Sequence, residues 1–140
     1  MGKLLDKGEK IMTDKELIDS AKKALEKAYV PYSKFRVGAA ILTKTGNVYT
    51  GCNVEIASFG ATNCAERTAV WKAVSEEGRI EIEKIAIASD DDDFIFPCGI
   101  CRQVMAEFAD DDMKLLCTNK AGDYKEIRFG DILPNAFRSF

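Results

Sequence analysis

The segment KIAIAS, residues 84–89, is the feature that most restricts the fold of this chain. It is a short apolar run, which is typical of a strand buried on both faces of a sheet. Segments with helical patterning lie on either side of it, at residues 65–78 and 98–109. Because strands that alternate with helices favour a mostly parallel or mixed sheet covered by helices, we predict an α/β fold, a three-layer α/β/α sandwich with a five-stranded mixed sheet.

The other strands follow from local patterning. The apolar segments FRVGAAILT (35–43) and VYTGCNV (48–54) flank the turn signal Gly46-Asn47, and this arrangement predicts a β-hairpin. Two further short apolar runs complete the predicted sheet at residues 114–118 and 125–129.

The first helix has a clear start and stop. Thr13 and Glu16 form the T-x-x-E pattern of a capping box, and apolar residues then recur at helical spacing. The helix should end before Pro31, because the residue that precedes a proline avoids the α conformation. No linker or repeat divides the 140 residues, so we predict a single domain over residues 1–140, with disorder within residues 1–12.

Composition excludes several classes of protein. The net charge of −3 argues against a nucleic-acid partner, which requires a concentrated positive surface. No apolar run approaches the ~20 residues of a membrane-spanning helix, and the N-terminus lacks the apolar core of a signal peptide. We therefore expect a cytoplasmic protein without a membrane partner, in which the five cysteines are thiols or metal ligands rather than disulfides.

Cys98 and Cys101 lie three residues apart at a predicted helix start that follows Pro97. Both sulfurs can then lie on one face of the helix, close to the ~3.8 Å that separates two thiolates bound at about 2.3 Å to a tetrahedral zinc ion. A C-x-x-C pair alone is weak evidence, because redox dithiols and structural zinc sites share it.

Cys64 adds a third thiol at a second helix start. Two helices on the same face of a sheet can bring their N-termini together at its edge, where open α/β sheets bind ligands. The chain contains no histidine, and three cysteines would leave a fourth position open, as in catalytic zinc sites. Cys52 and Cys117 lie in predicted strands and are interpreted as small buried side chains.

Glu66 and Arg67 accompany these thiols. A lone glutamate in a first helical turn usually compensates the helix dipole, but beside three thiols Glu66 is interpreted as a proton carrier. Three thiolates and Zn²⁺ together carry a charge of −1. Two helix N-termini offset that charge, and Arg67, three residues after Cys64, is the candidate donor to the sulfurs, although a solvated surface arginine is the alternative.

The motifs CAERTAV (64–70) and PCGICRQVMAEF (97–108) resemble the cytidine deaminases, specifically the small homotetrameric class with three cysteine ligands. The resemblance extends from about Ala28 to Phe137. It implies that Cys64, Cys98 and Cys101 hold one zinc ion per chain, with water at the fourth position. It also implies that Glu66 is the general acid/base that converts cytidine and 2′-deoxycytidine to uridine and 2′-deoxyuridine in pyrimidine salvage, with release of ammonia.

The same resemblance implies the substrate contacts. Phe35 would pack against the nucleoside, Asn53 and Glu55 would hydrogen-bond the ribose 3′-hydroxyl, and the backbone of Ala65 would contact the base edge. Phe137 would reach the site of a neighbouring subunit in a homotetramer. The alternative for Phe35 is a place in the core, and for Phe137 a C-terminal plug under the sheet.

Two other functions remain open at this point. One is a deaminase of a modified cytosine nucleoside such as blasticidin S, which would share the C-A-E and P-C-x-x-C motifs. The other is a non-enzymatic zinc-stabilised module or a C-x-x-C redox protein, although a structural zinc site would require four protein ligands. A polynucleotide editor is disfavoured, because the sequence has no cluster of Lys and Arg to line its groove.

Overall fold

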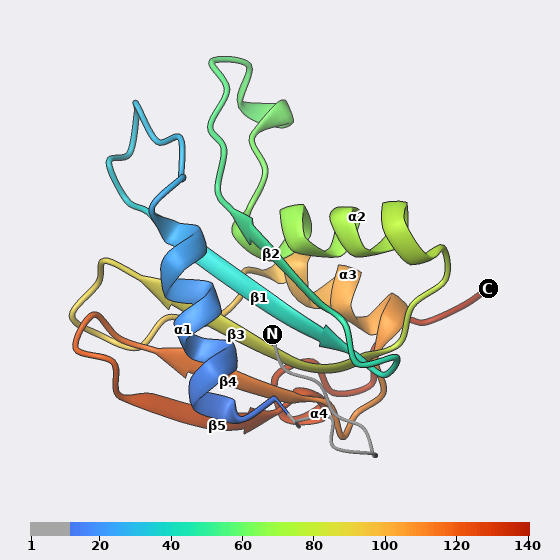
Figure 1. The fold of residues 1–140 in the computed structure, drawn as a ribbon. Coiled ribbons are helices and arrows are strands. Elements are labelled where there is room, and N and C mark those ends of the chain that lie inside the picture. The colour runs from blue at the N-terminus through green and yellow to red at the C-terminus, as the bar shows by residue number, and fades with distance from the viewer. Residues whose placement is uncertain (1–11) are drawn as a thin grey trace.

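The computed structural model describes residues 12–140 and contains one five-stranded sheet with the order β2-β1-β3-β4-β5 (Figure 1). Only β3 and β4 are parallel neighbours, and the other adjacent pairs are antiparallel. The five-stranded mixed sheet predicted from the sequence is therefore confirmed. Its strands are β1 (Val37–Thr43), β2 (Val48–Cys52), β3 (Ile82–Ser89), β4 (Lys114–Thr118) and β5 (Tyr124–Arg128).

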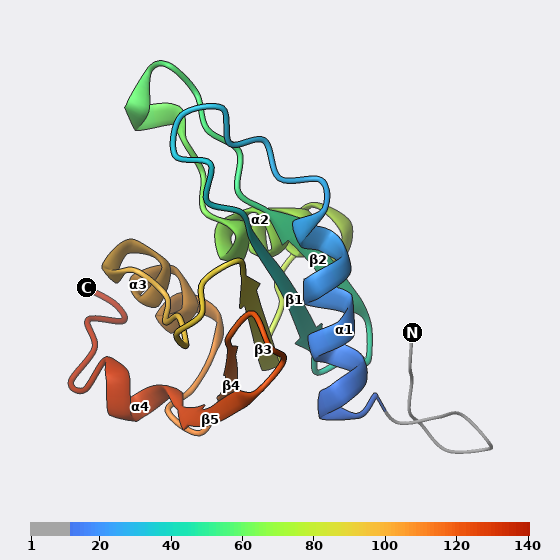
Figure 2. The same cartoon turned by 90° about the vertical axis from the view of Figure 1, so that its left-hand side faces the viewer.

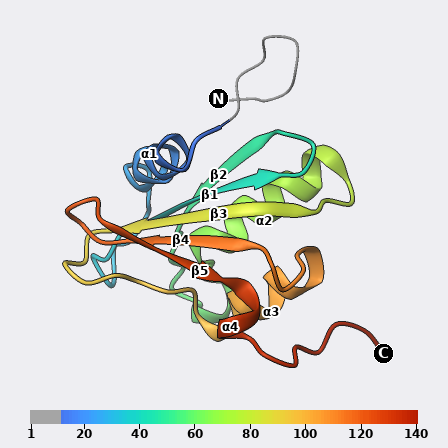
Figure 3. The same ribbon diagram turned by 90° about the horizontal axis from the view of Figure 1, so that it is seen from below.

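Helices cover both faces of the sheet, as the three-layer prediction requires (Figures 2 and 3). α1 (Asp14–Leu25) packs on one face, and α2 (Ala65–Glu77) and α3 (Gly99–Phe108) lie on the other. Two short elements were not predicted, a 3₁₀ turn η1 (Phe59–Ala61) and a one-turn helix α4 (Phe129–Ile132). None of the helices among residues 12–140 is long and apolar enough to cross a membrane.

Strand β3 shows why the fold has three layers. Its side chains alternate between two hydrophobic clusters, since Ile85 and Ile87 pack under α2 and α3 while Ala86 and Ala88 pack under α1. All four are at most 2% exposed. A strand with two apolar faces is stable only between two helical layers, so the continuous apolar run specifies the sandwich.

The first helix begins as predicted. The Thr13 hydroxyl accepts a hydrogen bond from the Glu16 amide at 3.1 Å, and the Glu16 carboxylate accepts one from the Thr13 amide at 2.9 Å. Leu17, Ala21 and Leu25 bury the apolar face of α1 against the sheet. Residues 1–11 of the stretch expected to contain disorder lie outside the described residues, whereas Met12 is 6% exposed and packs in the α1 cluster.

The predicted β1–β2 hairpin is present, and its turn is fastened to α2. Gly46 adopts a φ of +96°, which favours glycine, at the turn after β1. The Glu77 carboxylate at the end of α2 accepts hydrogen bonds from Thr43 (3.1 Å), Thr45 (3.0 Å) and Asn47 (2.9 Å). The turn and the helix end are thereby held together.

Two loops rise beyond the end of the sheet where β1 starts (Figure 1). One precedes β1 and the other, residues 53–63, follows β2. Backbone bridges join Tyr29 to Val54 and Val54 to Asn63, so the two loops form one projecting unit. This unit carries three of the predicted substrate residues, Phe35, Asn53 and Glu55.

Candidate metal and active site

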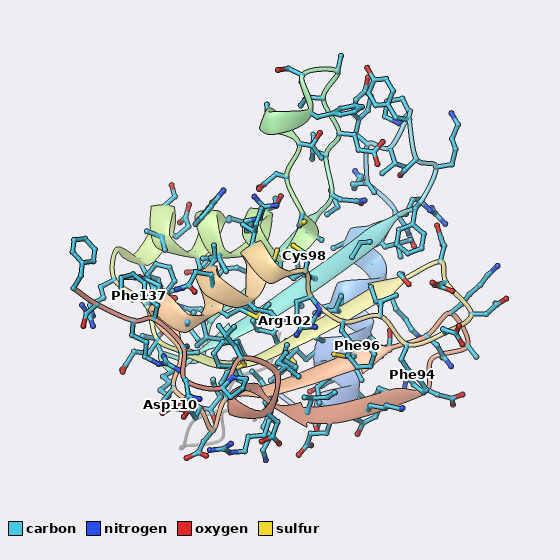
Figure 4. All side chains as sticks on the ribbon, turned by 180° about the vertical axis from the view of Figure 1, so that it is seen from behind. Phe94, Phe96, Cys98, Arg102, Asp110 and Phe137 are labelled. Atoms are coloured by element: carbon cyan, nitrogen blue, oxygen red, sulfur yellow. The ribbon has the colours of Figure 1, made fainter. Side chains whose placement is uncertain are left out.

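Three cysteines far apart in the sequence meet where α2 and α3 begin. Cys64 is the N-cap of α2, Cys98 is the N-cap of α3, and Cys101 lies in the first turn of α3. Their sulfur atoms lie within 4.8 Å of one another, and the Cys64 and Cys98 sulfurs are 3.8 Å apart. Figure 4 shows Cys98 at the start of α3, close to α2.

Sheet topology brings the two helix starts together. β2 and β3 both run antiparallel to β1, which lies between them, so β2 and β3 point the same way. Their carboxyl ends therefore share one edge of the sheet. α2 follows β2 and α3 follows β3, which places both helix N-termini at that edge, as is usual for ligand sites in open α/β sheets.

The donor set fits a zinc ion. Two thiolates bound at about 2.3 Å in tetrahedral geometry lie roughly 3.8 Å apart, which is the distance between the Cys64 and Cys98 sulfurs. The side chains of the two N-cap cysteines, Cys64 and Cys98, make no capping hydrogen bond, so both sulfurs are available to a metal ion. Among residues 12–140 no other group of three or more cysteines or acidic residues converges in this way, and the aspartates at 90–93 do not.

Glu66 lies beside the sulfurs in the first turn of α2 and is only 5% exposed. Burial raises the pKa of its carboxyl to about 7, opposed by a backbone hydrogen bond and assisted by the negative Cys64 sulfur. A carboxyl with a pKa near 7 can both accept and return a proton at neutral pH.

Arg67 supplies positive charge to the thiols. Its Nη2 atom donates to the Cys64 sulfur at 3.2 Å. Hydrogen bonds from Cys101 and from Arg67 lower the pKa of Cys64 to about 5, against the effect of burial. Arg67 Nε is the buried side-chain nitrogen of the described residues that has no hydrogen-bond partner, so this guanidinium has a further donor beside a thiolate-rich site.

The remaining cysteines differ from these three. Cys117 in β4 is fully buried, and burial raises the pKa of its thiol to about 12, which keeps it neutral. Cys52 is half-buried at the end of β2, and neither residue belongs to the sulfur cluster. All five cysteines are free thiols.

Asn53 fastens the start of β1 to the end of β2. Its side-chain amide donates to the Phe35 carbonyl at 2.9 Å and accepts from the Val37 amide at 2.9 Å. The Phe35 ring is 37% exposed, so it is not a core side chain of the single chain. β1 begins at Val37, two residues later than predicted, because this side-chain clamp replaces strand pairing at Phe35.

Glu55 binds the turn that precedes Phe35. One carboxylate oxygen accepts hydrogen bonds from the Tyr32 and Ser33 amides, each at 3.0 Å, and the other accepts from the Ser33 hydroxyl. The sequence analysis did not identify Ser33. The only signal for it was its place in the turn after Pro31, opposite a carboxylate more than twenty residues away.

Two of the predicted substrate-binding residues, Ala65 and Phe137, lie far apart in the single chain. Ala65 is buried as the first residue of α2, next to Cys64. Phe137 is 62% exposed and lies at the opposite end of α3 from Cys98 (Figure 4). Its carbonyl accepts a hydrogen bond from Gln103 at 2.7 Å, and its ring stacks on Phe140. One chain alone therefore does not bring Phe137 to the sulfurs.

Arg102 was also missed by the sequence analysis. Its Nε atom donates to the Pro97 carbonyl at 2.8 Å, and its Nη1 atom donates to the Ile132 carbonyl at 3.0 Å (Figure 4). These bonds tie the loop that carries Cys98 to the C-terminal segment. Both acceptors are backbone atoms distant in sequence from each other, so no motif indicates the pairing.

Comparison with known proteins gives a consistent result. Residues 11–117 match the family described as the cytidine and deoxycytidylate deaminase zinc-binding region. The cytidine deaminase of Sporosarcina psychrophila is 48% identical over 126 residues, covering 90% of this chain and 92% of that protein. The cytidine deaminase of Halalkalibacterium halodurans is 53% identical over 121 residues, covering 86% of this chain and 91% of that protein.

Solved structures agree with the sequence comparisons. The crystal structure of cytidine deaminase from Burkholderia pseudomallei superposes with a TM-score of 0.85 at 48% identity, covering 90% of this chain and all of that one. The cytidine deaminase from Mycobacterium tuberculosis superposes with a TM-score of 0.74 at 41% identity, covering 88% of this chain and 95% of that one.

Proposed function

This chain belongs to the cytidine and deoxycytidylate deaminase family, and from that membership we propose that it is a zinc-dependent hydrolase that converts cytidine and 2′-deoxycytidine to uridine and 2′-deoxyuridine with release of ammonia. The observation that carries the proposal is the buried Glu66 carboxyl beside three converging sulfurs. A deaminase of blasticidin S is not favoured, because the most similar relatives described above are cytidine deaminases.

The three cysteines would hold the zinc ion through Cys64, Cys98 and Cys101. When bound, zinc acts as a Lewis acid that lowers the pKa of a water molecule and so provides a nucleophile at neutral pH. Arg67 and the N-termini of α2 and α3 offset the negative charge of the thiolates, which would otherwise oppose the loss of a proton from that water.

Glu66 would carry the proton through the reaction. It takes a proton from the attacking water and delivers it to N3 of the pyrimidine, which makes C4 more electrophilic. The oxygen of that water would bond to C4. Glu66 would then take the second proton of the same oxygen and deliver it to the amino group, so that the C4–N bond breaks, ammonia leaves and the carbonyl of uridine forms. Burial suits Glu66 to this task, because a carboxyl with a pKa of about 7 exchanges its proton in both directions with little loss of driving force.

Substrate selection is assigned to the projecting loops and to the first residue of α2. Phe35 would pack on the nucleoside, Asn53 and Glu55 would bind the ribose 3′-hydroxyl, and the Ala65 backbone would contact the base edge. A site that pairs a sugar hydroxyl rejects analogues that lack it, because its own polar groups would be left unpaired. This supports nucleosides over free cytosine as substrates.

We assign the enzyme to the cytoplasm as a homotetramer in which Phe137 completes a neighbouring site. The use of cysteines as metal ligands rather than in disulfides is typical of a reducing compartment. Trp71 and Ile100, 48% and 61% exposed, line an apolar groove between α2 and α3, which suits contact with another subunit. The exposed position of Phe137, away from its own sulfur cluster, supports the same assignment.

The test combines a metal count with an ammonia-release assay on the purified protein and its Glu66→Gln variant. We expect one zinc ion per chain in both proteins, deamination of cytidine by the natural chain, and a loss of about 100- to 10,000-fold in kcat for the variant, because only the proton carrier is removed. Full turnover by Glu66→Gln would disprove the assigned role. Release of ammonia from blasticidin S but not from cytidine would favour the alternative substrate, and full activity of the zinc-free protein would favour a redox function.

A further inference from the structure

The Glu55 carboxylate is held by a turn rather than standing free in solvent. Its first oxygen accepts two backbone N–H groups, from Tyr32 and Ser33, and its second oxygen accepts the Ser33 hydroxyl. The Ser33 oxygen in turn accepts the backbone N–H of Phe35 at 3.0 Å. One hydroxyl therefore links the carboxylate to the backbone of the residue whose ring is assigned to the nucleoside.

Counting acceptor sites shows what this arrangement leaves. A carboxylate offers about four lone-pair sites to donors. The two amides occupy both sites of one oxygen, and the Ser33 hydroxyl occupies one site of the other. A single acceptor site remains, on the oxygen that Ser33 orients.

The charge state of Glu55 suits a hydroxyl donor. The hydrogen bonds from the Ser33 hydroxyl and amide lower the pKa of the Glu55 carboxyl, so it is ionised at neutral pH. An ionised carboxylate can only accept, and a bond from a neutral hydroxyl to it is among the stronger hydrogen bonds. The remaining site is thus complemented by a hydrogen-bond donor, which a sugar supplies as an O–H group.

A cavity adjoins this carboxylate. It has a volume of about 410 Å³ and is lined by Tyr32, Ser33, Glu55, Phe59 and Thr62. Pockets for small ligands span roughly 300–1,000 Å³, so the space is sufficient for a sugar. Its lining combines the aromatic rings of Tyr32 and Phe59 with the hydroxyl-bearing residues Ser33 and Thr62 and the Glu55 carboxylate.

We propose that Ser33 is a positioning residue for the sugar of the nucleoside: it orients the Glu55 carboxylate so that one fixed acceptor site receives a ribose hydroxyl. This inference rests on the function proposed above and extends it. The hydrogen bonds of the Ser33 side chain and amide go to Glu55 and Phe35 and not to the sulfur cluster or Glu66, so its contribution falls on binding of the sugar and not on proton transfer.

The experiment compares the natural chain with Ser33→Ala and with the conservative variant Ser33→Thr, which keeps the hydroxyl. Each protein is assayed for kcat and KM with cytidine and with 2′,3′-dideoxycytidine, which lacks both the 2′- and the 3′-hydroxyl. Removing a hydroxyl that orients a charged acceptor should raise KM for cytidine about tenfold and change kcat by less than about twofold. Ser33→Ala should leave dideoxycytidine nearly unaffected, and Ser33→Thr should retain the discrimination.

A purely structural role for Ser33 predicts a different pattern. It would lower the melting temperature and reduce kcat/KM for both substrates alike, and either an equal loss on both substrates or a fall in kcat at constant KM overturns the inference. If Ser33→Ala does not fold, Ser33→Cys, with a weaker donor of similar size, should show the same selective rise in KM. Failure of the natural chain to release ammonia from cytidine would instead count against the proposed function.

Discussion

A substitution at Gly51 tests directly whether the packing of α2 against the sheet determines the geometry of the candidate metal and active site. This glycine lies in β2, opposite Ala39 of β1, and is buried under the first turns of α2. A Cβ atom at Gly51 would stand 2.5 Å from the Ala69 amide nitrogen and 2.6 Å from the Ala65 carbonyl oxygen. Both are backbone atoms of α2, which has Cys64 as its N-cap and Glu66 in its first turn. Gly51→Ala should therefore displace the whole helix from the sheet.

The size of the shift follows from these contacts. Ordinary van der Waals contact begins at 3.4 Å, so the helix must withdraw by about 0.9 Å from its present 2.5 Å approach. Overpacking of this kind destabilises a protein by about 1–3 kcal/mol. Displacement of catalytic groups by roughly 1 Å can lower the rate about 100-fold, and we expect that loss in kcat/KM for cytidine.

The matched control is Gly38→Ala. Gly38 lies in the neighbouring strand β1 and faces α1, where an added Cβ would stand 2.1 Å from the Ala21 carbonyl oxygen. The control variant also overpacks a glycine against a helix backbone, but on the face of the sheet opposite the cluster of Cys64, Cys98 and Cys101. It should lose stability at least as much as Gly51→Ala and still hold its zinc.

Calorimetry, zinc analysis and ammonia release are measured for both variants, with activity assayed well below each melting temperature. Gly51→Ala should lose activity and zinc out of proportion to its loss of stability, whereas Gly38→Ala should keep kcat/KM within about threefold, as expected for a change on the other face. The reasoning is refuted if folded Gly51→Ala retains full activity, or if both variants lose activity in proportion to stability.

Three further results are expected. Cys98→Ser should bind zinc much more weakly and lose deamination with it, whereas Cys52→Ser should retain the metal, as checked by zinc titration of each. Removal of zinc with a chelator should abolish ammonia release and added zinc should restore it, which an unrestored activity would contradict. Burial raises the pKa of the Glu77 carboxyl, but its hydrogen bonds with Asn47, Tyr49 and Thr45 outweigh burial and lower it overall. Its stabilising contribution is then complete above the unfolded pKa of about 4.3 and is lost as pH falls through the folded pKa, so the melting-temperature difference between the natural chain and Glu77→Gln should shrink on acidification.

Local sequence predicted the five strands and the three longer helices of this fold because their signals are local, whereas the short elements η1 and α4 were not predicted. A few neighbouring residues are enough to predict each element, as in the apolar run at 84–89, the capping box at Thr13 and the turn at Gly46. The sulfur cluster required one step more. Cys64 is distant in sequence from Cys98 and Cys101. However, Cys64 and Cys98 both lie at the start of a helix, and helices that follow strands of the same direction start at the same edge of the sheet.

The contacts that hold the site in place could not be predicted from local sequence signals. Ser33 meets Glu55, and Arg102 meets the Ile132 carbonyl, only because loops with no periodic pattern fold back on each other. Backbone atoms also supply part of each contact, and a backbone carbonyl is the same at every position of a sequence. Such pairings depend on the tertiary path of the chain, so they become visible only in the folded structure.

The charge balance at the sulfur cluster explains why Arg67 and two helix N-termini lie beside the three cysteines. Three thiolates bind zinc tightly but donate charge to it, which opposes the loss of a proton from water; neutral histidines would not have this effect. The chain has no histidine, and it places positive ends of two helices and the Arg67 guanidinium against the sulfurs instead. Burial raises the pKa of the Glu66 carboxyl to about 7, and the negative Cys64 sulfur adds to that rise while Arg67 opposes it. Burial is therefore the main cause of the basicity of Glu66, and the Cys64 thiolate, whose charge makes the water harder to activate, adds to that basicity.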